Sequence, residues 1–528
     1  MKAILGAGAA TNSFDDIEQA STILIAGANP LECHPVIGAR IRQQVLRGGS
    51  KLIVIDPRRT ELADIATVHL ALKPGTDIAL QNAIAHVIIT EDRHDKIFID
   101  ARVDDFDAYA ENILEWTPER AAEVCELSAD DIRAAARIYA DNGPAYCAHG
   151  LGVTEHVQGT EAVMGLVNLA LITGNIGRPG SRINPLRGQN NVQGTAHMGC
   201  DPGILAGAQP VKEAREAFEQ AWNAKLPKGQ GLHLMQMIDA AVTSELKALI
   251  VIGYDIAATL ANESEVAKAL AKIDHVIVID LFETETAKRF GHLFLPAASS
   301  FEKDGTFMNA ERRIQRVRKL VEPPGIARAD WAIICDLADR MGHGQAFSYS
   351  SPEDIWDEIR DVWPAAAGIS YKRLDDQGLQ WPCPDEVHPG TTILHEKSFP
   401  HGMKARLRPL HFRASPEKVD TDYPIILSTG RNLFQFNVGT MTGRSSILQL
   451  RPTDTLDIGP EDALDLGVSE GETVSLRSRY GNARLPVHIS ERIKPGRAFA
   501  TFHDHARHVN RVTSPHRDRM VGAPEYKL

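Results

Sequence analysis

The chain has 528 residues, enough for about three or four domains and several hydrophobic cores, which excludes a disordered chain and a disulfide-stapled miniprotein. Its 57 lysines and arginines and 69 aspartates and glutamates give a formal net charge of −12, which argues against a general nucleic-acid-binding protein. The six cysteines are scattered without a Cys-x-x-Cys spacing, and no apolar run approaches the roughly 20 residues of a membrane helix. We therefore expect a soluble cytoplasmic protein with no disulfide framework, no local zinc or iron–sulfur site and no membrane span.

The first half of the chain alternates short β-branched runs with helical stretches, a pattern typical of a parallel sheet covered by helices. Buried strands are predicted at residues 22–26 and 51–55, with a helix at 34–47 between them. Further helices are predicted at 77–90, 129–140 and 160–173. The stretch 173–193 is rich in Gly, Pro and Asn, so we expect a long ordered loop or a domain crossing there.

A second unit resembles the first, with strands predicted at 248–252 and 275–279 and a helix at 263–272. In each unit a glycine turn follows the first strand, at Gly27 or Gly253, and an aspartate ends the second strand, at Asp56 or Asp280. The carboxyl end of a parallel strand is where nucleotides bind. The pattern indicates two nucleotide-like sites, with the alternative that any α/β protein could produce it by chance.

The pattern of residues changes in the last third of the chain, where the alternation of strands and helices ends. Residues 345–406 mix Trp and Pro without periodicity and are predicted to form an irregular connector. Short strands are predicted at 424–428, 473–479, 483–488 and 498–503, with one helix at 460–466. This arrangement is typical of a small β-barrel.

One segment, residues 184–194, is dense in amides and glycines and carries a single cation, Arg187. Amides can hydrogen-bond a large polar ligand from several sides, and the planar guanidinium suits a small carboxylate. We favour a ligand site here over a polar surface loop, because the Lys, Glu and Ser of ordinary surface loops are missing. A similar Gly-, Thr- and Arg-rich stretch at 428–444 would suit phosphates, although such turns are common in barrels.

Two histidine-containing patterns are weighed against simpler explanations. His503, His505 and His508 could bind a metal, but no fourth ligand stands at a familiar spacing, so a solvated or hydrogen-bonded polar stretch is favoured. Cys33 and His34 are adjacent and point in different directions, so they are not read as a nucleophile and its base. No metal ligand is assigned.

Several of these segments also carry a resemblance to a known family. Arg-Gly-Gln-Asn-Asn-Val-Gln-Gly at residues 187–194 is the most specific of a series of motifs, which comprise residues 27–35, 56–58, 72–77, 173–177, 187–194, 302–307, 441–443 and 524–527. Together they resemble the catalytic alpha subunits of molybdenum- or tungsten-dependent formate dehydrogenases, in the molybdopterin oxidoreductase family. The resemblance covers essentially the whole chain.

The resemblance implies a bis(molybdopterin guanine dinucleotide) cofactor with Mo or W. It implies that Arg187 holds formate, with Gln189 beside it. It also implies a set of residues that bind the cofactor, which are Asn29, Glu32, His34, Asp56, Arg58, Gly75, Asp77, Gly150, Gly152, Gly188, Gly253, Asp255, Asp280, Arg431, Gln435, Asn437, Tyr526 and Lys527. It also implies two α/β domains of the formate dehydrogenase/DMSO reductase type, at 1–190 and 191–345, a connector at 346–422 and a dinucleotide-binding β-barrel at 423–528.

The chain departs from the family pattern at its front. Family members begin with a cysteine-rich iron–sulfur region, followed by the Cys or selenocysteine that ligates the metal, and the segment matching residues 1–11 lies downstream of both. Position 292 is also His where relatives tend to have Asp. We therefore expect the body of a formate dehydrogenase, inactive alone and dependent on other subunits or on a missing N-terminal portion. The alternative is a non-catalytic cofactor-binding or assembly protein, or a truncated remnant, of the same family.

Overall fold

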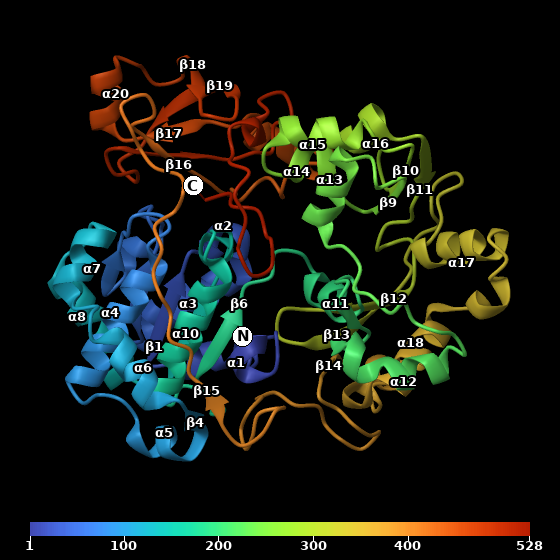
Figure 1. Ribbon diagram of the computed structural model, residues 1–528, viewed down its shortest axis with the longest axis horizontal. Helices are drawn as coiled ribbons and strands as arrows, with labels where there is room; N and C mark the ends of the chain where they lie inside the picture. The colour runs from blue at the N-terminus through green and yellow to red at the C-terminus, as the bar shows by residue number, and fades with distance from the viewer. Residues whose placement is uncertain (528) are drawn as a thin grey trace. The chain divides into compact units, whose positions relative to one another are not determined.

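The computed structural model describes residues 1–527, which form two compact units built from interleaved stretches of chain. Unit 1 comprises Met1–Leu186, Thr259–Ser264 and the described residues from Ile393 onward. Unit 2 comprises Arg187–Ala258 and Glu265–Thr392. Figure 1 shows unit 1 mainly in blue, cyan, orange and red and unit 2 mainly in green and yellow. Among residues 1–527, no helix is both long and apolar enough to cross a membrane.

The centre of unit 1 is a five-stranded parallel sheet with the order β3-β2-β1-β5-β6. Its strands are β1 (Thr22–Ala26), β2 (Lys51–Ile55), β3 (Val68–Leu70), β5 (Ala145–His149) and β6 (Arg182–Pro185). The strands predicted at 22–26 and 51–55 are confirmed. Strand β6 lies inside the stretch predicted as a loop, so that prediction is wrong there. The strand is hard to predict because it contains the polar residues Arg182 and Asn184. In the structure Arg182 is buried against the Phe14 ring, and Asn184 donates to the Tyr146 hydroxyl at 3.0 Å.

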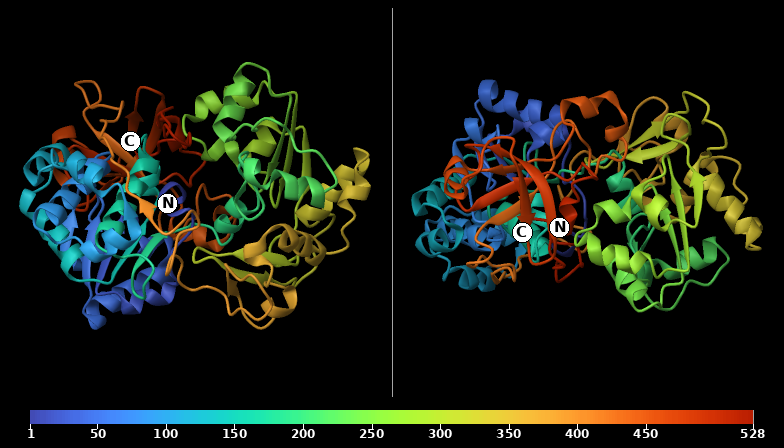
Figure 2. Two further views of the ribbon diagram at one scale, coloured as in Figure 1. Left: turned by 60° about the horizontal axis from the view of Figure 1, so that its bottom comes forward. Right: turned by 90° about the horizontal axis from the view of Figure 1, so that it is seen from above.

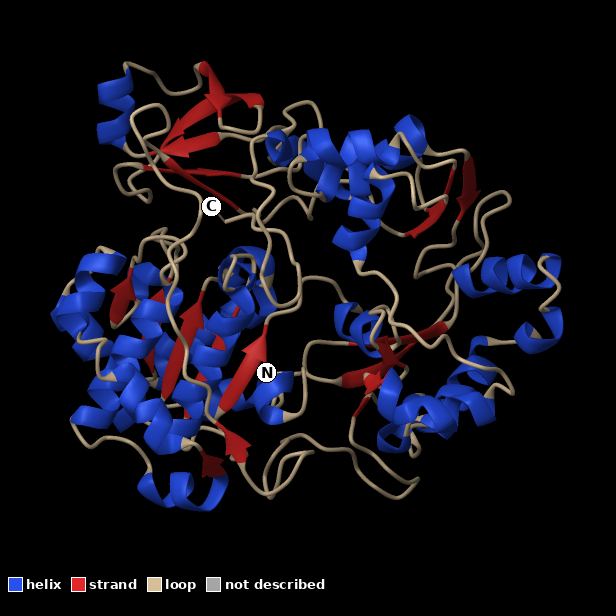
Figure 3. Ribbon diagram, viewed as in Figure 1, coloured by secondary structure: helices blue, strands red, loops and turns tan. Residues whose placement is uncertain are grey.

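Both faces of this sheet are covered, which is why the runs at residues 23–26 and 52–55 are apolar throughout rather than alternating. Leu24 and Ile53 belong to a core shared with the helices on one face, and Ile23 and Leu52 belong to a second core that includes Ile41. Figure 3 shows helices packed around the strands. The principal helices are α3 (Pro35–Gly48), α4 (Asp77–Thr90), α5 (Lys96–Arg102), α6 (Phe106–Ile113), α7 (Pro118–Cys125), α8 (Ala129–Asp141) and α10 (Gly159–Ile172).

A late segment of the chain, residues 393–413, completes the core of unit 1. Strand β15 (Ala405–Arg406) pairs in parallel with β4 (Val103–Asp104), and Leu407 and Leu410 are buried in the core that contains α4 and α10. The segment's backbone accepts hydrogen bonds from buried helix amides, from Asn82 to the Leu410 carbonyl at 2.9 Å and from Asn168 to the Arg408 carbonyl at 2.8 Å.

The C-terminal part of unit 1 is a curled five-stranded sheet of mixed orientation, with the order β16-β20-β17-β19-β18 (Figure 2). Its elements are β16 (Ile426–Thr429), β17 (Leu456–Ile458), α20 (Pro460–Leu466), β18 (Thr473–Arg477), β19 (Asn482–Ile489) and β20 (Arg497–Ala500). Strands β16 and β20 are parallel, as are β17 and β19, while β17–β20 and β18–β19 are antiparallel. Since β16 and β18 are the edges of this order, the predicted small β-barrel is not confirmed.

Unit 2 contains three small sheets, the smallest being the antiparallel pair β7 (Ile204–Leu205) and β8 (Gln209–Pro210). The first is parallel with the order β11-β10-β9, from β9 (Ala248–Ile252), β10 (His275–Asp280) and β11 (Leu293–Pro296). The second is antiparallel, from β12 (Gly305–Met308), β13 (Arg313–Val317) and β14 (Leu379–Gln380). The helices include α11 (Val192–His197), α12 (Val211–Ala221), α13 (Leu234–Val242), α16 (Glu285–Phe290), α17 (Asp330–Arg340) and α18 (Pro352–Val362).

Helix α18 lies in the segment predicted to be an irregular connector, so that prediction is wrong for these residues. Ser351 and Asp354 form a capping box, and Pro352 occupies the first turn. Trp356 is buried and its indole donates to the Ile369 carbonyl at 2.6 Å. The capping signal was present in the sequence, but the surrounding Trp and Pro residues obscured it.

Candidate functional site

The strand order of unit 1 creates a switch point between β1 and β5. Strand β1 leads toward β2 and β5 leads toward β6, so the chain leaves the carboxyl ends of these neighbours in opposite directions. Open parallel sheets bind ligands at such a crevice. The loops that leave the two strands meet there, because Gly152 N donates to the Gly27 carbonyl at 2.9 Å and Gly150 N to the Ala26 carbonyl at 3.1 Å.

Only glycine permits this close approach. Gly27 has a φ of +53°, and a Cβ atom on it would lie 2.5 Å from backbone atoms of Gly152 and Val153. A Cβ atom on Gly152 would in turn lie 2.7 Å from Gly27 Cα. The predicted residues Gly150 and Gly152 are therefore placed at the switch point, where they keep the two loops in contact.

Charged side chains predicted to bind a dinucleotide gather at the ends of β1 and β2. Glu32 lies on the short helix α2 (Pro30–Cys33), and burial raises its pKa while Arg58 acts in the opposite direction. Asp56 follows β2, its Oδ1 accepts from Arg58 N at 2.9 Å, and burial raises its pKa. The Arg58 guanidinium lies 3.6 Å from the centre of the Phe499 ring. Strand β20 of the C-terminal sheet thus supplies an aromatic face to this cluster.

The C-terminal residues bring a second set of groups to the same place. Lys527 Nζ donates to the Thr429 carbonyl at 2.8 Å and lies 3.2 Å from a Glu155 carboxylate oxygen, and burial lowers the pKa of Lys527. Tyr526 points elsewhere, because its hydroxyl donates to the Thr259 carbonyl at 2.9 Å and accepts from Ala261 N at 3.2 Å. Tyr526 therefore secures the short stretch Thr259–Ser264 within unit 1.

The Cys33 thiol interacts electrostatically with several of these charged groups. Burial raises the pKa of its thiol and Glu32 raises it further, while Arg431, Arg58 and Lys527 lower it. The pKa of this one thiol is therefore affected by charged side chains from α2, from the loop after β2, from the loop after β16 and from the chain's last described residues. The structure brings together residues that are separated by nearly the whole length of the chain.

The most informative property of this cluster is a set of buried polar atoms that have no hydrogen-bond partner among residues 1–527. They are Asn29 Oδ1, Glu32 Oε2, Arg431 Nε, Gln435 Oε1 and Asn437 Oδ1. Each unsatisfied buried polar atom costs on the order of 1–3 kcal/mol, so native proteins rarely leave several together without a reason. All five belong to residues predicted to bind the dinucleotide. The donors and acceptors therefore fit a large polar ligand that contacts both the sheet edge and the 431–437 loop.

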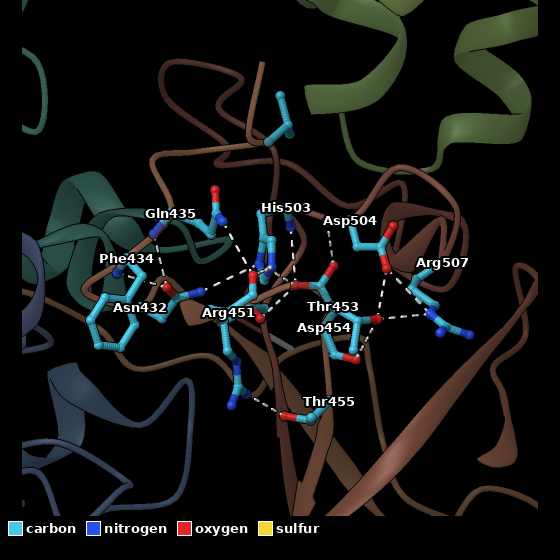
Figure 4. A network of polar contacts seen from close by, with 12 residues as sticks. Asn432, Phe434, Gln435, Arg451, Thr453, Asp454, Thr455, His503, Asp504 and Arg507 are labelled. Carbon is cyan, nitrogen blue, oxygen red and sulfur yellow. Dashed lines mark hydrogen bonds and ion pairs between the residues drawn. The ribbon is translucent and has the colours of Figure 1, made fainter. Parts of the chain in front are cut away.

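The 431–437 loop is held by a buried ion pair, shown in Figure 4. His503 Nδ1 lies 2.6 Å from Asp454 Oδ1, and His503 Nε2 lies 3.1 Å from the Arg451 carbonyl oxygen. Asn432 lies 3.3 Å from His503 through its amide nitrogen, and its Oδ1 accepts from Gln435 N at 2.9 Å. His503 is thus buried and hydrogen-bonded rather than solvated, and it connects the loop to the sheet.

The other predicted residues near this edge lie on or beside helix termini. Gly75, with a φ of +81°, forms the turn before α4, and Asp77 is the buried first residue of that helix. Burial raises the pKa of Asp77, and His156 acts in the opposite direction. His34 is half-buried between α2 and α3 and donates its backbone N–H to the Pro30 carbonyl at 2.9 Å.

Unit 2 repeats the first unit's turn geometry, which confirms the predicted pseudo-repeat at atomic detail. Gly253 N donates to the Ile279 carbonyl at 2.9 Å, and Gly27 N donates to the Ile55 carbonyl at 2.8 Å. Both glycines have a positive φ, +61° and +53°. In each case the accepting residue directly precedes the aspartate, Asp280 or Asp56, that was predicted to bind a nucleotide.

The two aspartates of unit 2 that were predicted to bind a nucleotide differ in their hydrogen-bond partners. Asp255 accepts from Thr286 N at 2.9 Å, from Thr286 Oγ1 at 2.7 Å and from Glu285 N at 3.1 Å, so its carboxylate holds the first turn of α16. Asp280 accepts from Leu281 N at 2.7 Å, and burial raises its pKa. His292, which departs from the family pattern, accepts from Val276 N at 3.1 Å and so belongs to the sheet.

The loop around Arg187 begins unit 2. Arg187 is half-buried, burial lowers its pKa, and its Nε donates to Gln193 Oε1 at 3.2 Å. The predicted companion Gln189 is exposed, as is Gly188. Arg187 contacts Gln193 instead, and Gln193 is fully buried and bonded to His197. Gln193 and His197 were not predicted as site residues, although their i, i+4 spacing on a short helix was a usable signal.

Comparisons with known proteins agree with this geometry. Residues 5–340 match the family described as molybdopterin oxidoreductase, and residues 425–528 match the molybdopterin dinucleotide binding domain. The chain is 42% identical to the F420-dependent formate dehydrogenase subunit alpha of Methanocaldococcus jannaschii, over 100% of this chain and 78% of that protein. It is 36% identical to formate dehydrogenase H of Escherichia coli, over 99% of this chain and 74% of that protein.

A solved structure has the same fold. Acetylene hydratase from Pelobacter acetylenicus superimposes with a TM-score of 0.80 at 21% identity, over 100% of this chain and 78% of that chain. At that identity the likeness is one of fold alone.

Proposed function

The chain belongs to the molybdopterin oxidoreductase family, and from that premise we propose that it is the cofactor-holding body of a formate dehydrogenase alpha subunit. The relatives with 36–42% identity over the whole chain are named formate dehydrogenases, and the one with 42% identity is named a subunit alpha. The observation that carries the proposal is the set of buried, unpartnered polar atoms near the switch point, because nucleotides bind at such points and their donors and acceptors suit a polar ligand.

The unpartnered polar atoms of unit 1 suit one dinucleotide, and we propose a second at unit 2, so that the chain would hold a bis(molybdopterin guanine dinucleotide) cofactor with Mo or W. The first would be held in unit 1 by Asn29, Glu32, Arg431, Gln435 and Asn437, with Lys527 supplying positive charge for phosphate. The second would be held at the equivalent edge of unit 2, next to Gly253 and Asp280. When bound, the cofactor supplies the metal centre that takes up the two electrons of the reaction.

Arg187 is the group proposed to bind formate. Oxidation of formate to carbon dioxide releases one proton and two electrons, and the carboxylate keeps both its oxygens. A fixed guanidinium can hold those two oxygens bidentately and orient the C–H bond, which is the positioning contribution available to a protein for so small a substrate. The arginine stays cationic in spite of its burial, because a guanidinium does not deprotonate in proteins.

The relatives are named as alpha subunits, so we also propose that this chain works with further subunits that carry the electrons onward. Its cytoplasmic location stays a prediction.

The proposal is tested on this chain purified as the assembled enzyme, together with its partner subunits and any N-terminal portion, from a host that makes molybdopterin guanine dinucleotide. Pterin content is measured by fluorescence after oxidation, and activity by formate-dependent reduction of a viologen dye. Arg187→Ala should abolish formate turnover, by a factor of about 10² or more, with the pterin content unchanged. Arg318→Ala is the matched control, because Arg318 is a half-exposed arginine of the same unit paired with Asp375.

The possible results separate the alternatives. Wild-type protein without pterin would contradict the proposal. Bound pterin with no formate turnover would favour a non-catalytic cofactor-binding or assembly protein of the same family. Loss of pterin in Arg187→Ala would make this residue part of the cofactor site instead of the formate site.

A further inference from the structure

A hydrogen-bonded relay inside unit 2 links Arg187 to a histidine. Arg187 Nε donates to Gln193 Oε1 at 3.2 Å, and Gln193 Nε2 lies 2.8 Å from His197 Nδ1. Gln193 and His197 are the second and last residues of α11, so they lie on one face of that helix. Gln193 is 0% exposed and His197 is 4% exposed.

The direction of the relay follows from donor and acceptor chemistry. A guanidinium can only donate, so the amide of Gln193 must turn its oxygen toward Arg187. The amide nitrogen then faces His197 Nδ1, which must accept. An imidazole whose Nδ1 accepts is neutral and carries its proton on Nε2. The Arg187–Gln193 bond and this tautomer of His197 therefore require each other.

A competing arrangement is built into the same helix. His197 Nδ1 also lies 3.0 Å from the backbone carbonyl oxygen of Gln193. If Nδ1 carried a proton it would donate to that carbonyl, and Gln193 Nε2 would then face another N–H. The amide would have to turn over and present its nitrogen to the guanidinium, where two donors would meet. The choice made at His197 is thus transmitted to Arg187.

The surroundings keep the relay in one place. The His197 ring lies 5.0 Å from the Trp381 ring and 6.1 Å from the Trp363 ring, measured between centroids. The start of the helix is anchored to β12, because Met308 N donates to Asn191 Oδ1 at 2.9 Å. Aromatic packing fixes the imidazole plane, and the helix anchor fixes the backbone from which Gln193 projects.

We propose that His197, acting through Gln193, is a positioning residue that sets the direction of the Arg187 guanidinium for a small carboxylate substrate. This inference rests on the proposed role of Arg187 in formate binding. Because the relay engages Nε, it orients the plane of the guanidinium and with it the pair of terminal nitrogens that forms a carboxylate fork.

The test compares two substitutions of His197 in the cofactor-loaded protein. His197→Phe keeps an aromatic ring beside the two tryptophans and removes the acceptor, whereas His197→Asn offers an amide oxygen at the Nδ1 position. We expect His197→Phe to raise the KM for formate and its dissociation constant about tenfold, with a smaller change in kcat, and His197→Asn to recover most of the affinity. Melting temperatures and pterin contents are measured alongside, and a role confined to stability would move those values instead.

A second measurement keeps the test independent of folding defects in the variants. In wild-type protein labelled with ¹⁵N-histidine, His197 should show an unprotonated Nδ1 and a protonated Nε2, and Gln193→Leu should shift it to the Nδ1–H tautomer. A protonated Nδ1 in the wild type would overturn the relay. Unchanged formate affinity in His197→Phe, together with loss in Arg187→Ala, would overturn the relay but leave the formate site standing. Unchanged affinity in Arg187→Ala would overturn both.

Discussion

Asp454 is the residue on which the fixed shape of the 431–437 loop depends. It is 0% exposed, and its carboxylate accepts from His503 N at 3.1 Å, Thr501 Oγ1 at 2.5 Å and Asp504 N at 2.8 Å in addition to the ion pair with His503. Burial acts to raise its pKa, but the His503 and Thr501 bonds and the Asp504 N–H prevail, so the pKa of Asp454 lies below its ordinary value. A buried carboxylate with this many donors stabilises the fold only while it is ionised.

The pH dependence of that stabilisation follows from the direction of the shift. A group with a lowered folded pKa stabilises fully above its unfolded value, about 3.9 for aspartate, and this stabilisation is lost as the pH falls through the folded pKa. Asp454→Asn should cost about 3 kcal/mol at neutral pH, because the amide that replaces the carboxylate cannot accept from all of the buried donors of Thr501, His503 and Asp504. The gap in melting temperature between wild type and variant should stay constant at neutral pH and close below about pH 4, as measured by calorimetry.

The exposed Asp465 of α20 supplies the comparison. Asp465→Asn should leave the melting temperature within experimental error across the same pH range. A gap of equal size in both variants would show that the effect belongs to the net charge of the sheet.

At the scale of elements, the crossing of the β1–α2 and β5–α9 loops is the feature most sensitive to a single methyl group, α9 being Leu151–Thr154. Gly27→Ala combines a left-handed backbone with a Cβ atom 2.5 Å from the backbone of Gly152 and Val153, so we expect a loss of about 3 kcal/mol and loss of bound pterin. Gly49→Ala is the control, because Gly49 has a φ of +79° with nothing within 4 Å of its Cβ position. Chemical denaturation should show a cost of about 1 kcal/mol there, and equal costs at the two positions would contradict the close-contact explanation.

The elements also show what the sequence can and cannot predict. Strands β1, β2, β9 and β10 were predicted because each is a short run of branched apolar residues. Burial on both faces produces that pattern in β1 and β2, whereas β9 alternates buried and exposed residues. Strand β6 was missed because its polar side chains find their contacts, Arg182 over the Phe14 ring and Asn184 with the Tyr146 hydroxyl, only in the folded chain.

Site residues follow the same division. An aspartate after a strand looks the same whether it binds a nucleotide or holds a helix, and only the structure shows that the Asp255 carboxylate receives the N–H groups of Glu285 and Thr286. Arg187 could be singled out from local composition, because it is the one cation in a segment of amides and glycines. Its partners could not, since Gln193 and His197 acquire meaning only through a side-chain geometry that composition does not encode.

At the scale of the whole molecule, unit 1 cannot be obtained from the first part of the chain alone. Residues 1–186 contain the five-stranded sheet and its helices, but the amides of Asn82 and Asn168 are satisfied by the backbone of residues 408–410. A fragment ending at Leu186 would expose the apolar surface that Leu407 and Leu410 cover, together with those amides. We expect it to aggregate or to show molten-globule properties by near-UV circular dichroism and gel filtration.

Supplying residues 393–528 as a second polypeptide should restore a soluble complex of the two pieces. A well-folded, monomeric fragment 1–186 would contradict this expectation and would make the later segment an accessory.

The hydrogen bonds from the side-chain amides of α4 and α10 to the backbone of residues 408–410 also determine the order in which unit 1 can fold during synthesis. Asn168 and Asn82 are synthesised 240 and 328 residues before the carbonyls that they bond, which at about 5–20 residues per second is a delay of roughly 12–66 s. During that interval the apolar surface that Leu407 and Leu410 later cover is exposed to solvent, together with the side-chain amides of Asn82 and Asn168. Such a surface suits a chaperone that binds nascent chains. The interleaved chain path therefore makes the closing of unit 1 a late step of chain synthesis. It also leaves the edge that would receive the dinucleotide open until the 431–437 loop has been synthesised.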